Sequence, residues 1–164
     1  MAQTKSNHET DFLLRMIDEA YEKRAWHGPN LKGSLRGLSA REASWRPNPN
    51  RHNIHEIAVH AAYWKYIVRR RLLGEKRGSF PLKGSNWFKR PDHATEREWR
   101  DDVALLDQAH RSLREAIALI SPRTLHHTPA GSSTSNVMQI QGIAFHDVYH
   151  AGQIQFLKRL IPTE

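Results

Sequence analysis

The segment from about 136 to 160 most constrains the fold, because it reads as one long α-helix with two histidines among its apolar residues. Its inward stripe is Ile143, His146, His150, Gln153 and Leu157. Residues four apart lie one above the other on a helix, so His146 and His150 share a face. Burying two imidazoles without partners is costly, and a shared metal ion relieves that cost. The segment therefore predicts two nitrogen ligands for one ion.

Three further segments with helical spacing of apolar residues predict helices at about 9–25, 53–73 and 95–120. Gly28-Pro29, Gly74 and Ser121-Pro122 mark their ends. Capping boxes are expected where a carboxylate follows the capping residue by three positions, at Ser39–Glu42, Asn53–Glu56 and Thr95–Glu98. Lys65 and the arginines at 69–71 fall mostly outside the apolar stripe of the second helix or in its last turn. With no alternating strand pattern, the chain is expected to form an all-α four-helix bundle with long loops.

The third metal ligand is expected on the second helix, where His60 lies on the inward stripe with Ile57 and Trp64. His55 is about 140° round the helix from His60, so both cannot face one ion. Three histidines leave coordination positions open for water or substrate, as in a catalytic site. The alternative is a set of core histidines that are bonded to Gln153, Asp147 or backbone carbonyls.

Several other residues are candidates for supporting roles around this site. Glu56, Asp147 and Gln153 are positioned to bond the ligands, and Trp26, His27, Trp64 and Trp87 are candidates for a pocket lining. Arg46 and Arg71 are candidate partners for an anionic ligand. Residues 75–93 form a long connection with Phe80, Trp87 and Phe88, which is expected to pack over an opening.

Composition limits the classes of function. The 164 residues suit one domain, 1–164, and no run of 18 apolar residues predicts a membrane helix. The N-terminus lacks an apolar leader, which favours a cytoplasmic location. Cysteine is absent, so a metal must be held by His, Asp or Glu. The net charge of +8 raises nucleic-acid binding as a hypothesis, but the basic residues are spread over several elements and no DNA-reading motif is found.

Four stretches resemble the DinB superfamily, also called DinB/YfiT-like. They are Ile57-Ala58-Val59-His60-Ala61-Ala62-Tyr63-Trp64, His146-Asp147-Val148-Tyr149-His150-Ala151-Gly152-Gln153-Ile154, Trp26-His27-Gly28-Pro29 and Ala43-Ser44-Trp45-Arg46-Pro47. The resemblance implies a four-helix bundle in up-down-down-up order. It also implies a divalent ion (nickel, zinc, manganese or iron) held by His60, His146 and His150, and a homodimer.

The same resemblance implies two classes of reaction on a small-molecule substrate. Relatives include S-transferases that use low-molecular-weight thiols such as bacillithiol or mycothiol, a maleylpyruvate isomerase, and proteins described only as metal-dependent hydrolases. A metal ion held by three histidines lowers the pKa of a bound water or thiol, which suits hydrolysis or S-transfer. No catalytic side chain is predicted. The alternatives are a bundle that binds metal without catalysis and a nucleic-acid-binding bundle.

Overall fold

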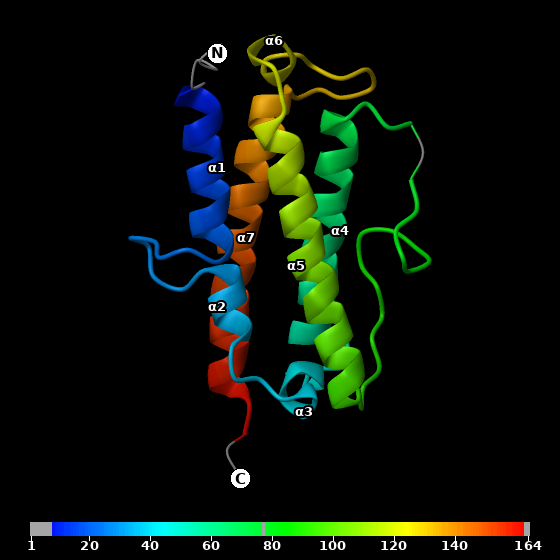
Figure 1. Ribbon diagram of the computed structural model, residues 1–164. Helices are drawn as coiled ribbons and strands as arrows, with labels where there is room; N and C mark the ends of the chain where they lie inside the picture. Colours follow the sequence, from blue (N-terminus) through cyan, green and yellow to red (C-terminus); the bar gives the residue numbers. More distant parts are fainter. Residues whose placement is uncertain (1–7, 77, 163–164) are drawn as a thin grey trace.

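The computed structural model describes residues 8–76 and 78–162, in which every regular element is a helix (Figure 1). The helices are α1 (His8–Tyr21), α2 (Leu31–Leu35), α3 (Ala40–Ser44), α4 (Ile54–Leu72), α5 (Glu96–Ala118), α6 (Pro122–Leu125) and α7 (Asn136–Leu160). The long helices α1, α4, α5 and α7 lie side by side, α6 and α3 lie at opposite ends, and α2 lies beside α7 part-way along the bundle (Figure 1). The expected all-α class is confirmed.

The directions of the long helices explain the long connection after α4. In Figure 1, α1 and α7 run away from the end that carries α6, whereas α4 and α5 run toward it. Two consecutive helices that point the same way need a connection that returns along the bundle. Residues 73–76 and 78–95 supply it, and they follow the outer side of α4 and α5 (Figure 1).

Helix boundaries follow the predicted signals with two differences. The first helix ends at Tyr21, four residues before the predicted end, because the amides of Glu22 and Lys23 both donate to the carbonyl of Asp18 and widen the last turn. The short helix α6 was not predicted. It is one turn long and begins at Pro122, a residue that suits the first helical position.

The predicted N-terminal caps form, and one capping partner was assigned wrongly. Ser39 with Glu42 and Thr95 with Glu98 make complete capping boxes. Asn53 caps α4 by accepting the Glu56 amide at 2.8 Å, which typically contributes about 1 kcal/mol. The Glu56 carboxylate does not return to Asn53, because Arg46 binds it at 2.8 and 3.0 Å.

A buried polar layer divides the core into two apolar clusters. Ala61 and Ala151 belong to the cluster nearer α3, whereas Val68 and Ala144 belong to the cluster nearer α6. Between them lies the ion pair of Lys65 on α4 with Asp147 on α7, and both side chains are fully buried. The expectation that Lys65 lies on an outer face was wrong.

The position of Lys65 follows from its neighbours on three helices. Its ammonium group lies 3.4 Å from Nδ1 of His110 on α5 and 4.8 Å from the ring centroid of Tyr21 on α1. A buried ammonium group needs such partners, and only the packed bundle supplies them. Among the described residues, no helix has the length and apolar character needed to cross a membrane.

Candidate metal centre

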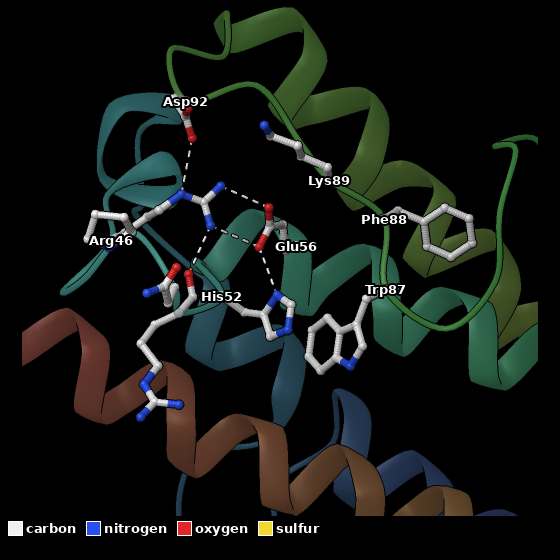
Figure 2. A pocket seen from close by; sticks show the side chains of 10 residues that line it. Arg46, His52, Glu56, Trp87, Phe88, Lys89 and Asp92 are labelled. Atoms are coloured by element: carbon white, nitrogen blue, oxygen red, sulfur yellow. Dashed lines mark hydrogen bonds and ion pairs between the residues drawn. The ribbon is translucent and has the colours of Figure 1, made fainter.

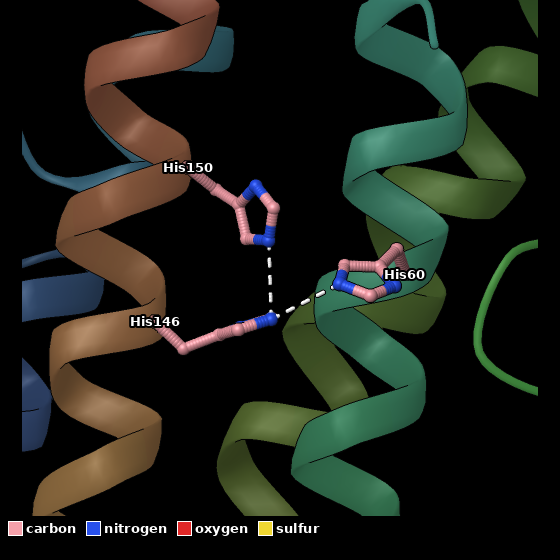
Figure 3. A group of neighbouring side chains, drawn as sticks. All are labelled: His60, His146 and His150. Atoms are coloured by element: carbon pink, nitrogen blue, oxygen red, sulfur yellow. Dashed lines mark hydrogen bonds between the residues drawn. The ribbon is translucent and has the colours of Figure 1, made fainter.

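Three histidine side chains converge between α4 and α7 (Figure 3). Nε2 of His146 lies 3.0 Å from Nε2 of His60 and 3.1 Å from Nε2 of His150. His60 and His150 are buried and His146 is half-buried. The helical repeat places His146 and His150 on one face of α7, and the packing of α4 against α7 brings His60 to them.

Hydrogen bonds at the far side of two rings determine where their protons lie. Nδ1 of His60 lies 2.8 Å from the backbone carbonyl of Asn86, and Nδ1 of His150 lies 2.7 Å from Oε1 of Gln153. A carbonyl oxygen only accepts, so each Nδ1 carries the proton. In a neutral imidazole the Nε2 atom then has a free lone pair, which is the form that binds a metal ion.

The surroundings keep all three imidazoles neutral. Burial lowers the pKa of His60, and it lowers the pKa of His146 to about 3 and that of His150 to about 4. For His146, the neighbouring His150 and His60 add to the effect, because a second positive charge beside either would be repelled. The lone pairs of His60 and His150 therefore face the centre of the cluster at neutral pH.

A cation between the three rings satisfies their nitrogen atoms better than any placement of the ring protons does. Nδ1 of His146 is buried and finds no hydrogen-bond partner among the described residues, so either tautomer leaves one nitrogen of this ring unmatched. If the proton of His146 is on Nδ1, the Nε2 lone pairs of all three histidines point at one another, and they repel unless a positive ion lies between them. Two tetrahedral ligand nitrogens around zinc lie about 3.3 Å apart, on the basis of Zn–N bonds of about 2.0–2.1 Å. The observed separations are close to that value, so the residues present fit a metal ion.

The sequence model of the DinB superfamily matches residues 25–154. The chain belongs to the DinB superfamily. The match covers most of the chain and includes His60, His146 and His150. Searches among curated proteins and among solved structures found no match.

Three residues of this DinB-superfamily protein were predicted to bond the metal ligands, and the structure gives each of them a different partner. Gln153 accepts from His150, as one of the sequence hypotheses requires, and its amide nitrogen donates to Oη of Tyr149 at 3.1 Å. Asp147 pairs with Lys65 instead, and its second oxygen has no partner in the described chain. Glu56 binds Arg46 and His52, and this holds its pKa near 2 despite burial. Gln153 alone of the three contacts a ligand ring.

Of the residues predicted to line the pocket, some lie beside the metal ligands and others lie away from them. Trp64 meets His60 and His146 edge-on, at centroid distances of 6.4 and 6.5 Å. Trp26 was wrongly predicted to line the pocket, because its side chain is fully exposed in the corner after α1. His27 lines shallow cavities on the side of α7 that faces α1, away from the metal ligands. Local sequence gave no sign of this difference, since both residues belong to the same short loop.

The two arginine candidates are occupied by protein partners. Arg46 lines a cavity but is held by Glu56 and by Asp92 at 3.0 Å, and its pKa is raised by these carboxylates (Figure 2). Arg71 donates to the side chain of Gln139 at 3.2 Å. The Arg46 guanidinium is therefore neutralised, whereas Arg71 is exposed and lines neither of the cavities beside the metal centre.

The connection between α4 and α5 reaches the metal centre through Asn86 and Trp87, and Asn86 was not predicted. Asn86 has a left-handed backbone (φ 64°) that presents its carbonyl to His60, while its side chain accepts from Nε1 of Trp64 at 2.9 Å. Asn tolerates this conformation better than most residues. An asparagine in a long loop is a weak signal, so sequence reasoning missed it.

Trp87 joins the metal centre to two cavities. Its indole stacks between the rings of His60 and His52, at centroid distances of 3.8 and 3.6 Å. A cavity of about 700 Å³ and one of about 490 Å³ share Trp87, His52 and Arg51 as lining residues. Figure 2 shows the larger cavity, with Trp87 beside His52. Gln153 lines the smaller one, so both cavities adjoin residues that contact the metal ligands.

Proposed function

We propose that this protein is a metal-dependent enzyme that holds a divalent ion through Nε2 of His60, His146 and His150. The observation that carries the proposal is the convergence of three neutral imidazoles, two of which have a carbonyl oxygen on Nδ1. Zinc, nickel, manganese and iron are the candidate ions, and imidazole suits zinc, nickel and iron especially.

The ligand set favours a catalytic site over a structural one. In the described chain the cluster contains three histidines and no fourth His, Asp or Glu. Structural zinc sites use four protein ligands, whereas catalytic sites keep a position open. When bound, the ion would supply Lewis acidity that lowers the pKa of a water or thiol ligand. Nδ1 of His60 and of His150 would keep their protons on the side away from the ion, by donating them to the Asn86 carbonyl and to Oε1 of Gln153, and burial keeps the rings neutral.

We propose thiol S-transfer as the reaction class, because the adjoining cavities suit a small organic anion. Arg51 lines both cavities and Lys89 lines the larger one, and neither side chain has an ion-pair partner among the described residues. The other cation there, Arg46, is neutralised by Glu56 and Asp92. A low-molecular-weight thiol with carboxylate groups fits these free cations.

The finer features implied by the family are proposed with this function. The directions of α1, α4, α5 and α7 in Figure 1 support the up-down-down-up order. A single domain over 1–164, a cytoplasmic location and a homodimer stay predictions, as does the absence of a nucleic-acid partner.

Elemental analysis of protein purified without a histidine tag tests the metal site. We expect about one divalent ion per chain, and we expect its loss in His60→Ala and His146→Ala. His93→Ala is the matched control, because His93 is exposed and lies outside the cluster. Unchanged metal content in the first two variants would show that the site is wrong.

A reaction screen of metal-restored protein tests the class of chemistry. Consumption of an electrophile that requires both the metal and a low-molecular-weight thiol supports the S-transferase. Turnover with water alone assigns the protein to the hydrolases instead. If no divalent ion binds and none restores turnover, the enzyme proposal fails.

A further inference from the structure

His52 and Glu56 form a histidine–carboxylate pair at the edge of both cavities beside the metal centre. Nδ1 of His52 lies 2.9 Å from Oε2 of Glu56, which is one helical turn further along the chain. Burial alone would raise the pKa of Glu56, but the bonds from Arg46 and His52 lower it to about 2, so this carboxylate is ionised at neutral pH. An ionised carboxylate only accepts hydrogen bonds, and the proton of the neutral ring therefore lies on Nδ1.

The second ring nitrogen of His52 is available to a ligand. Nε2 has no hydrogen-bond partner among residues 8–76 and 78–162, and Figure 2 shows it on the side of the ring away from Glu56. The side chain of His52 is 48% exposed, and it lines both the cavity of about 700 Å³ and the cavity of about 490 Å³. A ring that is held at Nδ1 by a carboxylate and faces a cavity with Nε2 has the arrangement of a general acid–base catalyst.

Two other histidine–carboxylate pairs in the described chain lack a cavity at the free ring nitrogen. Nε2 of His55 lies 2.6 Å from the carboxylate of Asp102, but this ring is fully buried inside the bundle. Nε2 of His126 lies 3.0 Å from the carboxylate of Glu9, but this exposed pair lines neither cavity beside the metal centre. The position of His52 therefore distinguishes its pair from histidines that only stabilise the fold.

Trp87 separates His52 from the metal ligands. One face of its indole stacks on His52 and the other on His60, at centroid distances of 3.6 and 3.8 Å, so the two histidines lie two stacking distances apart. His52 therefore does not belong to the ligand set. It is placed to exchange a proton with a part of the substrate that is displaced from the ion into the cavities. In S-transfer, the group that leaves the attacked carbon is displaced from the sulfur in this way.

The cavity of about 490 Å³ suits an uncharged electrophile with an apolar body. Ile57, Phe156 and Leu157 supply apolar surface there, and no aspartate or glutamate of the described chain lines it. The basic side chains in its lining are Arg51 and His52. Such groups stabilise negative charge that develops on a substrate during the reaction.

The charges around His52 suit a proton on Nε2. The charged side chains that line the larger cavity together with His52 are Arg46, Arg51, Glu56, Lys89 and Asp92. Arg46 binds both Glu56 and Asp92, which leaves one negative charge in excess, and an imidazolium at His52 balances it. The two remaining cations are the ones assigned above to the carboxylates of the thiol. Histidine is also the side chain that most readily gains and loses a proton near neutral pH.

We propose that His52 is the general acid of this enzyme, that Glu56 positions it, and that the substrate is an electrophile whose carbon–oxygen bond breaks, such as an epoxide. This role rests on the S-transfer proposed above. The thiol loses its proton to water and keeps the electron pair on sulfur, which forms a bond to an epoxide carbon. The carbon–oxygen bond breaks with its electron pair on oxygen, and the oxygen takes the proton from Nε2 of His52. His52 recovers a proton from solvent, to which it is half-exposed.

A comparison of two electrophiles tests the general acid. Metal-restored protein is assayed with bacillithiol, mycothiol or glutathione against styrene oxide and against chlorodinitrobenzene, whose chloride leaves without a proton. His52→Gln should lower kcat/KM for the epoxide by about 10²-fold or more and leave kcat/KM for the chloride nearly unchanged. The decline of the epoxide rate at alkaline pH should also disappear in this variant. Glu56→Gln should show the same difference between the two substrates, because it acts through His52.

A matched control separates the acid from a structural effect. His126→Gln removes the histidine of an equivalent pair with Glu9 and should keep both rates. A His52→Gln variant that loses both rates equally, or neither, would overturn the general acid and leave the S-transfer standing. A parent protein that accepts only the chloride would do the same. A parent that turns over neither electrophile with any of the three thiols would refute the S-transfer, and the role of His52 with it.

The tautomer of His52 tests the pair without any turnover. In alkaline buffer with zinc, the nitrogen NMR spectrum of the imidazole rings should show the proton of His52 on Nδ1, where Glu56 accepts it. The signal is assigned by its absence in His52→Gln, whose metal content should equal that of the parent. A proton on Nε2 in the neutral ring would show that Glu56 does not hold it, and would overturn the assignment.

Discussion

Replacing Lys65 by methionine should destabilise the protein severely, because it leaves Asp147 as an unpaired carboxylate in the core. Both side chains are fully buried, and one oxygen of Asp147 already lacks a partner in the described residues. Removing one member of a buried ion pair typically costs about 3–5 kcal/mol. Domains have only about 5–15 kcal/mol in total, so the thermal midpoint should fall by roughly 6–20 °C.

Replacing both partners should cost less than replacing one. In Lys65→Met with Asp147→Leu, neither position of the pair carries a buried charge, and apolar replacement of a buried ion pair is often tolerated. Urea unfolding of the two single variants and the double variant gives the coupling free energy, which we expect to exceed about 2 kcal/mol. Arg97→Ala is the control, because the Arg97–Asp101 pair is largely exposed and should contribute less than about 0.5 kcal/mol.

The pH dependence of the stability of Lys65→Met tests whether the charge on Asp147 causes the loss of stability. Burial raises the pKa of Asp147 and Lys65 opposes that rise, so removing Lys65 raises it further. An acid whose pKa is raised in the folded state binds its proton more tightly there than in the unfolded chain. Stability therefore falls as the pH rises above about 4, and the variant should be less impaired at pH 4 than at pH 8. A cost below about 1 kcal/mol, or additive single variants, would refute the reasoning.

Three further predictions concern the metal centre and its surroundings. Asn86→Gly should keep metal affinity and stability within about 0.5 kcal/mol, whereas Asn86→Val should lose about 1–3 kcal/mol in urea unfolding, because φ is positive there. Glu56→Gln should cost about 1.5–3 kcal/mol at pH 7 through its bonds to Arg46. The folded pKa of Glu56 is about 2, below its usual 4.5, so its stabilisation is lost as pH falls between these values and acid unfolding of the variant should be less steep. Metal affinity in a dye-competition assay should not decline as the pH falls from 8 to 6.5, the ordinary pKa of histidine, because the pKa values of all three ligands are lowered, and it should be lost below about 4, where His146 and His150 take up protons; a decline that begins near 6.5 would contradict the lowered pKa values.

Sequence determined the helices well because their signals are local. The i, i+4 spacing alone placed His146 and His150 on one face, and the capping residues located the starts of α4 and α5 to within a residue. It also identified His60 as an inward residue. Both kinds of inference need only the geometry of a single helix, which any folded form of the chain preserves.

Tertiary packing decided what those side chains meet. Lys65 follows His60 on the same helix, yet periodicity placed it outside, because a charged residue reads as exposed until partners from three other helices are known. Asn86 and Trp87 reach His60 only because two parallel helices force the connection between them back along the bundle. The partner of the Glu56 carboxylate was likewise Arg46, which lies ten residues away, and not its neighbour Asn53. Contacts between distant segments arise from packing, and a local sequence pattern indicates only which face of its own helix a residue takes.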